Sequence, residues 1–174
     1  MSLQDIQDSI RNVPNFPKPG IQFKDITTAV KQPKILKEIL ETIATQFKSQ
    51  KIDYVVGIES RGFIFGTALA YLLDCGFVPV RKPGKLPADV ISQEYALEYG
   101  TDKIEIHKDA LHAGDRVLVV DDLLATGGTA AAAAKLIDQT GAKIVAFTFV
   151  IELADLGGRQ LLENHAEVYS LVKY

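Results

Sequence analysis

The residues best suited to chemistry in this sequence lie directly after the apolar run Val-Leu-Val-Val at residues 117–120. Two carboxylates, Asp121 and Asp122, come first, and the small polar segment Ala-Thr-Gly-Gly-Thr follows at residues 125–129. Glycines let the backbone approach a ligand closely, and backbone N–H groups with two threonine hydroxyls can bind a phosphate. Carboxylate oxygens can accept hydrogen bonds from sugar hydroxyls or join the ligand shell of Mg²⁺. The pattern therefore predicts a site for a phosphorylated sugar.

A strand and a helix must position this segment. The apolar residues 117–120 are typical of a strand buried on both faces of a parallel sheet, and the alanine-rich run through Ala134 predicts a helix. We expect the strand to end before Asp121, since neighbouring side chains on a strand point to opposite faces and the two carboxylates could not otherwise act together. The segment lacks the lysine of a Walker A sequence, so the helix N-terminus, worth about half a charge, would attract the phosphate. An ordinary strand–helix turn would explain one carboxylate and one glycine, but not the whole pattern.

A second predicted strand, at residues 54–58, ends in a polar tip of the same kind. The tip is Glu-Ser-Arg-Gly at residues 59–62, and an apolar helix is expected from Phe63 towards Leu73. The planar fork of Arg61 suits a pyrophosphate because it donates two parallel hydrogen bonds. A surface turn with a solvated arginine is the alternative, and the repetition of the strand, polar tip and helix favours a binding site.

A third predicted strand, at residues 77–80, leads into a basic loop at residues 81–87. Arg81, Lys82 and Lys85 lie within five positions of this loop, which also holds two prolines. A run of charges is usually a solvated loop. In a chain of net charge -3, however, a local cluster of cations after a strand favours an anion-binding loop.

The composition is that of a globular protein of one domain, with 174 residues and a mass of 19.0 kDa. The net charge of -3 and a pI near 5.6 argue against nucleic-acid binding. One cysteine, Cys75, and three histidines exclude an internal disulfide and disfavour a Cys/His metal site. The N-terminus lacks the pattern of a signal peptide, and no apolar run approaches the roughly 20 residues of a membrane span. A cytosolic location is expected.

The remaining segments supply the other layers of an α/β protein. Apolar spacing predicts a helix over residues 3–13 with Ser2 as its cap. Three prolines predict a stiff, extended backbone over residues 12–20. Residues 88–108 are expected to form a hairpin lid from alternating strands at 94–99 and 103–107, joined by a turn at 100–102. Further elements are expected as a strand at 21–26, a helix from Pro33, a helix at 129–138 ended by Gly141, and strands at 143–151 and 167–171.

The segment at residues 117–129 resembles the phosphoribosyl-pyrophosphate motif of the type I phosphoribosyltransferases. Within this segment, the sequence Leu-Leu-Ala-Thr-Gly-Gly-Thr is most similar to the adenine phosphoribosyltransferases, and the resemblance extends over nearly the whole chain. It implies an α/β type I phosphoribosyltransferase fold, with a central, mostly parallel sheet flanked by helices. It also implies a single domain over residues 1–174, with an N-terminal hood at approximately residues 1–30 and a flexible catalytic hairpin loop at approximately residues 88–108.

The resemblance implies a purine salvage enzyme that converts adenine and 5-phosphoribosyl 1-pyrophosphate to AMP and pyrophosphate with Mg²⁺. Glu98 would act as the acid/base opposite N7 of adenine, and Arg61 would stabilise the leaving pyrophosphate. Asp121 and Asp122 would bind the ribose hydroxyls, and Mg²⁺ would be held mainly through the substrate, near these two carboxylates. The Glu59–Ser60 peptide would be cis. Three further sets of residues are implied: for the 5′-phosphate, Ala125, Thr126, Gly127, Gly128 and Thr129; for pyrophosphate, Glu59, Ser60, Arg61, Arg81, Lys82 and Lys85; for adenine, Gln22, Phe23, Lys24 and Leu153.

Two other functions remain open on the sequence. A 6-oxopurine phosphoribosyltransferase would use the same phosphate loop, although the set of Phe23, Glu98 and Leu153 favours adenine. A regulator that binds phosphoribosyl pyrophosphate without catalysis is the other, but it should lack Glu98 or the basic loop. The resemblance also implies a homodimer in which a residue of the basic loop reaches across the interface. No nucleic-acid or membrane partner is expected, because the net charge is -3 and no apolar run is long enough to span a membrane.

Overall fold

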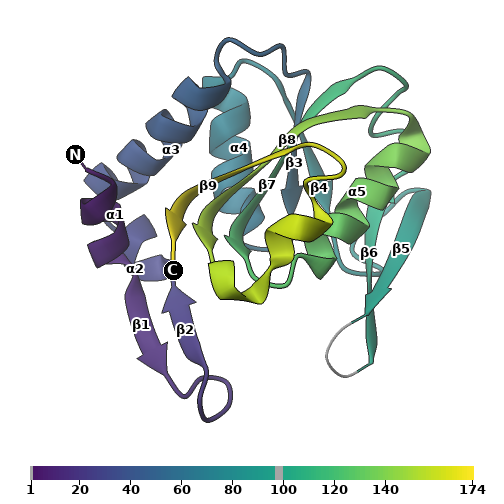
Figure 1. The fold of residues 1–174 in the computed structure, drawn as a ribbon. Coiled ribbons are helices and arrows are strands. Elements are labelled where there is room, and N and C mark those ends of the chain that lie inside the picture. Colours follow the sequence, from purple (N-terminus) through teal and green to yellow (C-terminus); the bar gives the residue numbers. More distant parts are fainter. Residues whose placement is uncertain (1, 97–99) are drawn as a thin grey trace.

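Five parallel strands form the centre of the molecule, in the order β4-β3-β7-β8-β9 (Figure 1). This arrangement confirms the predicted parallel sheet. The structure is a computed structural model and describes residues 2–96 and 100–174. Its strands are β3 Tyr54–Ile58, β4 Gly76–Val80, β7 Arg116–Leu124, β8 Lys143–Glu152 and β9 Glu167–Lys173.

Helices cover both faces of this sheet (Figure 1). One apolar core lies between the sheet and the helices α1, α3 and α4, and it contains the buried rings of Phe47 and Phe65. The other core lies under α5 and the hairpin β5–β6. In the described part of the chain, no helix is both long and apolar enough to cross a membrane. The helices are α1 Leu3–Ser9, α2 Thr27–Val30, α3 Pro33–Phe47, α4 Gly62–Leu72 and α5 Gly128–Thr140, with short 3₁₀ turns η1 Ala154–Leu156 and η2 Gly158–Leu161.

The N-terminal segment differs from its prediction in two places. Ser2 does cap α1, and it forms a capping box with Asp5. The helix ends at Ser9, however, because Val13 pairs with Phe23 in an antiparallel hairpin of β1 (Arg11–Pro14) and β2 (Gln22–Asp25). The prediction of an extended backbone over residues 12–20 is also wrong beyond β1, since the chain must reverse there to form the hairpin. These elements, with α2, are called the hood below, after the N-terminal segment that the resemblance implied.

The predicted hairpin near residues 88–108 is confirmed, with different strand bounds. Strand β5 (Val90–Ala96) pairs antiparallel with β6 (Thr101–His107). The prediction that residues 100–102 form the turn is wrong for the last two, because they pair with Ala96 and Tyr95 inside the ladder. Glu98, the candidate acid/base, lies outside the described residues, as do its two neighbours.

Candidate active site

The candidate residues gather along the carboxyl edge of the sheet. Because the strands are parallel, their carboxyl ends meet at one edge, and ligands of open α/β sheets bind there. In sheet order, β4 is followed by Arg81, β3 by Glu59, β7 by residues 125–129, and β8 by Leu153. Residues 125–129 are called the phosphate loop below, after the 5′-phosphate that they are predicted to bind. The β1–β2 and β5–β6 hairpins project beyond the same edge in Figure 1. Segments far apart in the sequence are thereby brought to one place.

The acidic pair lies inside strand β7, so the prediction that the strand ends before Asp121 is wrong. Pairing with β8 continues through Asp121↔Phe149 and Leu124↔Glu152, which keeps the backbone extended. The two carboxyl groups nevertheless stay close enough to interact with each other, so they can act together although the strand continues. Asp122 is 4% exposed, whereas Asp121 is partly buried and its Oδ1 accepts a hydrogen bond from the N–H of Asp122 at 2.9 Å. Burial, followed by the negative charge of Asp122, raises the pKa of Asp121 well above its ordinary value.

Arg61 forms an ion pair with Asp122, although the sequence assigned the two side chains to different parts of the substrate. Its Nε donates to Oδ2 of Asp122 at 2.5 Å. Burial disfavours the charge of Arg61, but the pair with Asp122 raises the pKa of the guanidinium above its ordinary value. The next residue, Gly62, is needed for this approach, because a Cβ there would lie 2.8 Å from the carbonyl oxygen of Val120. The Glu59–Ser60 peptide before Arg61 is cis, as the resemblance implied.

The basic loop is tied to the tip of β3 by a bidentate ion pair. Arg81 donates from Nε and Nη2 to the two carboxylate oxygens of Glu59, at 3.1 and 3.0 Å. Glu59 also accepts from the N–H of Lys82 at 2.9 Å. These contacts, first of all that of Arg81, lower the pKa of Glu59. The carboxylate of Glu59 thus holds the basic loop, and the carbonyl oxygen of Lys85 accepts from Nη1 of Arg81 at 3.1 Å.

The side chain of Lys82 connects the basic loop to the β5–β6 hairpin. Its Nζ donates to the hydroxyl of Tyr95 at 3.1 Å and pairs with the carboxylate of Asp102. This pair, with Lys82 as the main cause, lowers the pKa of Asp102. Of the predicted pyrophosphate residues, Arg61, Arg81 and Lys82 each have an acidic partner, so a bound pyrophosphate would have to share or displace these carboxylates.

The phosphate loop ends at the N-terminus of helix α5. Gly127 is the N-cap with φ +81°, a backbone conformation that suits glycine. Within the described chain no side chain caps this helix, so the N–H groups of its first turn point towards the loop without a side-chain acceptor. A glycine that the sequence analysis missed packs against the loop from outside. A Cβ on Gly158 would lie 2.2 Å from the carbonyl oxygen of Ala125, and the doublet Gly157-Gly158 was the only sequence signal for it.

A cavity of about 510 Å³ lies between the hood and Arg61. Two of the predicted adenine residues, Phe23 and Lys24, line it, whereas Gln22 and Leu153 are not part of its described lining. The rings of Phe16 and Phe23 meet edge to face at 5.2 Å between centroids. The sequence analysis missed Phe16 as a lining residue. The complete lining is Val13, Phe16, Phe23, Lys24, Asp25, Ile26, Thr27 and Arg61.

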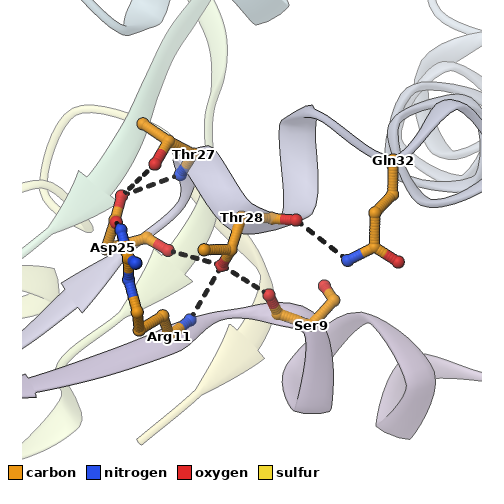
Figure 2. A network of polar contacts seen from close by, with 6 residues as sticks. All are labelled: Ser9, Arg11, Asp25, Thr27, Thr28 and Gln32. Carbon is orange, nitrogen blue, oxygen red and sulfur yellow. Dashed lines mark hydrogen bonds and ion pairs between the residues drawn. The ribbon is translucent and has the colours of Figure 1, made fainter.

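A network of polar contacts holds the hood in place (Figure 2). Asp25, which also lines the cavity, accepts hydrogen bonds from the N–H and hydroxyl of Thr27 at 2.9 and 2.6 Å and pairs with the guanidinium of Arg11. Thr27, followed by Arg11, lowers the pKa of Asp25 to about 2. Thr28 accepts from the N–H of Arg11 at 3.0 Å and donates to the carbonyl oxygen of Ser9 at 2.6 Å. These contacts join α1, β1, β2 and α2, so the cavity wall has a defined position.

The fold and the site together define a phosphoribosyltransferase. Residues 26–172 match the family model described as the phosphoribosyl transferase domain. An adenine phosphoribosyltransferase from Gloeobacter violaceus is 59% identical over 170 residues, which cover 98% of this chain and 99% of that protein. The crystal structure of adenine phosphoribosyltransferase from Thermoanaerobacter pseudethanolicus has a TM-score of 0.96 at 50% identity, covering 99% of this chain and 100% of that one. The enzyme from Saccharomyces cerevisiae, solved with an imino-altritol bisphosphate and adenine, has a TM-score of 0.92 at 43% identity and 98% coverage of both chains. The chain belongs to the adenine phosphoribosyltransferase family.

Proposed function

We propose that this protein transfers the phosphoribosyl group of 5-phosphoribosyl 1-pyrophosphate to adenine, and so forms AMP and pyrophosphate. The observation that carries the proposal is the double role of Arg61. Its side chain lines the hood cavity and also pairs with Asp122, two residues before the end of the strand that leads into the phosphate loop. A base bound in the cavity and a sugar phosphate bound at the loop would therefore share one arginine. The names of the relatives described above support adenine as the base.

The reaction breaks the bond between C1′ and the pyrophosphate oxygen and forms a bond between C1′ and N9 of adenine, which loses its proton. Positive charge develops on the sugar and negative charge on the leaving group. Arg61 and the basic loop would stabilise the departing pyrophosphate, and the backbone N–H groups at the start of α5 would anchor the 5′-phosphate. Asp121 and Asp122 would position the ribose hydroxyls. Glu98 would accept or donate a proton at N7.

We propose Mg²⁺ as the cofactor, held mainly through substrate oxygens. Among residues 2–96 and 100–174 there is no group of three or more His, Cys, Asp or Glu side chains that could hold a metal ion. Asp121 and Asp122 supply carboxylates that fit a Mg²⁺ whose other ligands are phosphate oxygens and water, which is how this ion is usually bound with phosphate substrates. When bound, Mg²⁺ would neutralise charge on the leaving pyrophosphate.

We also propose a homodimer in the cytoplasm. Helix α4 starts next to Arg61 and exposes Ile64 (43%), Tyr71 (85%) and Leu72 (45%) along an apolar groove of about 800 Å³ against α3. Exposed apolar surface of this kind often marks a protein contact, and the family resemblance implies a second copy of the chain. Light scattering after gel filtration tests this. A dimeric wild type and a weakened dimer in Tyr71→Ser would agree with the proposal, and a monomeric wild type would refute it.

The test of the activity is AMP formation from adenine and phosphoribosyl pyrophosphate with Mg²⁺, run beside hypoxanthine and guanine. Turnover of adenine alone is expected. Turnover of hypoxanthine or guanine instead would favour a 6-oxopurine phosphoribosyltransferase. Binding of phosphoribosyl pyrophosphate without turnover of any of the three bases would favour a regulator without catalysis. Glu98→Ala should lower kcat by about 10²–10⁴-fold if this side chain is the acid/base. Glu98→Gln, which keeps the size of the side chain, should be nearly as slow.

A further inference from the structure

The segment between β8 and β9 supports the phosphate loop from outside. The backbone of Gly158, the first residue of η2, touches all three residues that precede helix α5. A Cβ on Gly158 would lie 2.2 Å from the carbonyl oxygen of Ala125, and 2.7 Å from both the carbonyl carbon of Thr126 and the nitrogen of Gly127. In return, a Cβ on Gly127 would lie 2.5 Å from the carbonyl oxygen of Gly158. The two glycine backbones are thus packed against each other, with no room for a side chain between them.

Arg159 fixes the position of this contact, because it follows Gly158 directly and is held by a forked ion pair. Its Nε and Nη2 donate to the two carboxylate oxygens of Glu152 at 2.8 and 2.6 Å. Its Nη1 donates to the carbonyl oxygen of Val168 in strand β9 at 2.7 Å. Glu152 is only 4% exposed, and Arg159, as the main cause, lowers its pKa. A planar fork that is bound at three points leaves the guanidinium one orientation.

The other end of the same segment is also tied to strand β7. The N–H of Leu153 donates to the carbonyl oxygen of Leu124 at 2.9 Å, and Leu124 is the last residue before the phosphate loop. Residues 153–158 therefore form a closed loop whose first residue is tied to the end of β7 and whose last residue touches the phosphate loop. The pair of Glu152 and Arg159 closes this loop at its base.

We infer that Arg159 and Glu152 are positioning residues for the phosphate loop, acting through Gly158. The inference rests on the proposed function, since it takes residues 125–129 as the 5′-phosphate site. Neither side chain is assigned a contact with the substrate. When the fork is lost, Gly158 can move away, and the backbone N–H groups that face the 5′-phosphate lose their common position. The loss should fall on ligands with a 5′-phosphate and spare ligands bound by the basic loop and the tip of β3.

The experiment compares Arg159→Lys with wild type, since lysine keeps the charge but cannot form the fork. In initial-rate assays we expect KM for phosphoribosyl pyrophosphate to rise about 10- to 100-fold, the cost of a misplacement near 1 Å. KM for adenine should change by less than about 2-fold, a small part of one tenfold step in binding, because neither Arg159 nor Glu152 is part of the described lining of the hood cavity. Calorimetry should give a matching rise in Kd for ribose 5-phosphate and an unchanged Kd for inorganic pyrophosphate.

Arg116→Lys is the matched control. Arg116 begins strand β7 at the opposite edge of the sheet, where its Nε donates to the carbonyl oxygen of Lys51 at 2.7 Å. Its variant loses a comparable arginine contact and should keep both Kd values. Glu152→Gln provides the second route if Arg159→Lys does not fold, because it removes the charge with little change in shape. It should weaken ribose 5-phosphate selectively as well.

Equal losses for ribose 5-phosphate and pyrophosphate, or no loss for either, would overturn the positioning role. Failure of the proposed function looks different, since the wild type would then form no AMP from adenine. Calorimetry with ribose 5-phosphate would still report whether Arg159 controls the phosphate loop in that case.

Discussion

Replacing Phe23 by alanine should weaken adenine binding more than any other step of the reaction. Phe23 lines the cavity beside Arg61, and Phe16 braces its ring edge to face at 5.2 Å. A braced ring loses little freedom when a base stacks on it. Base–aromatic stacking is worth about 1–3 kcal/mol per base on alanine substitution, and 1.4 kcal/mol corresponds to about tenfold in affinity. KM for adenine should therefore rise by about 5- to 150-fold.

Initial rates with adenine varied at saturating phosphoribosyl pyrophosphate measure this effect. Because stacking is present in both the ground state and the transition state, kcat should change little. Phe23→Tyr keeps the ring and serves as the control, with KM for adenine close to that of wild type. A rise in KM for phosphoribosyl pyrophosphate with an unchanged KM for adenine would refute the assignment of Phe23 to the base.

Three further predictions concern stability and the phosphate loop. Thr148 is fully buried, and its hydroxyl has no hydrogen-bond partner among the described residues. Thr148→Val should therefore stabilise the fold by about 1 kcal/mol or more, raising Tm by about 2–4 °C per kcal/mol; a lower Tm in thermal denaturation would mean that the hydroxyl is bonded. Gly127→Ala should destabilise the fold and abolish ribose 5-phosphate binding in calorimetry, since φ is +81° and the new Cβ would lie 2.5 Å from the carbonyl oxygen of Gly158. Gly20→Ala is the control, because Gly20 has φ +89° and open space around it, so this variant carries only the cost of backbone strain, about 1–2 kcal/mol. Equal effects of Gly127→Ala and Gly20→Ala would count against the contact with Gly158. The pKa of Asp121 is raised in the folded protein, so the unfolded chain loses this proton first as the pH rises. The free energy of unfolding therefore falls as the pH rises from about 3.8, the ordinary pKa, to the folded pKa. Urea denaturation across this range should find Asp121→Asn increasingly more stable than wild type as the pH rises, and a pH-independent difference would contradict the burial of that carboxyl.

The ion pair of Arg61 shows how the site orients its cations before substrate binds. Three cations of the site are each paired with a carboxylate: Arg61 with Asp122, Arg81 with Glu59, and Lys82 with Asp102. None of these three contacts therefore carries a net positive charge. A cation held by a carboxylate is already oriented, so less freedom is lost when a phosphate takes a share of it.

The sequence alone determined the order along the chain of the five strands of the sheet and of the helices α3, α4 and α5. These features depend on short-range physics. Apolar, β-branched runs favour buried strands, and Gly127 serves at a left-handed position that other residues adopt only with strain. The parallel sheet and the polar or basic segments that follow its strands were therefore predictable from neighbouring residues. The resemblance to a family then supplied roles that no local pattern could give.

Only the tertiary structure decided which side chains meet. Arg61 and Asp122 are 61 positions apart in sequence, and their pair exists because β3 and β7 are neighbours in the sheet. Strand β7 continues through both acidic residues because β8 pairs with it there, which no property of the acidic residues predicts. Gly158 packs against residues 125–127, and the next residue, Arg159, binds Glu152 at the end of β8. Ion pairs and backbone contacts of this kind depend on distances in space, and those are set only when the strands have found their partners.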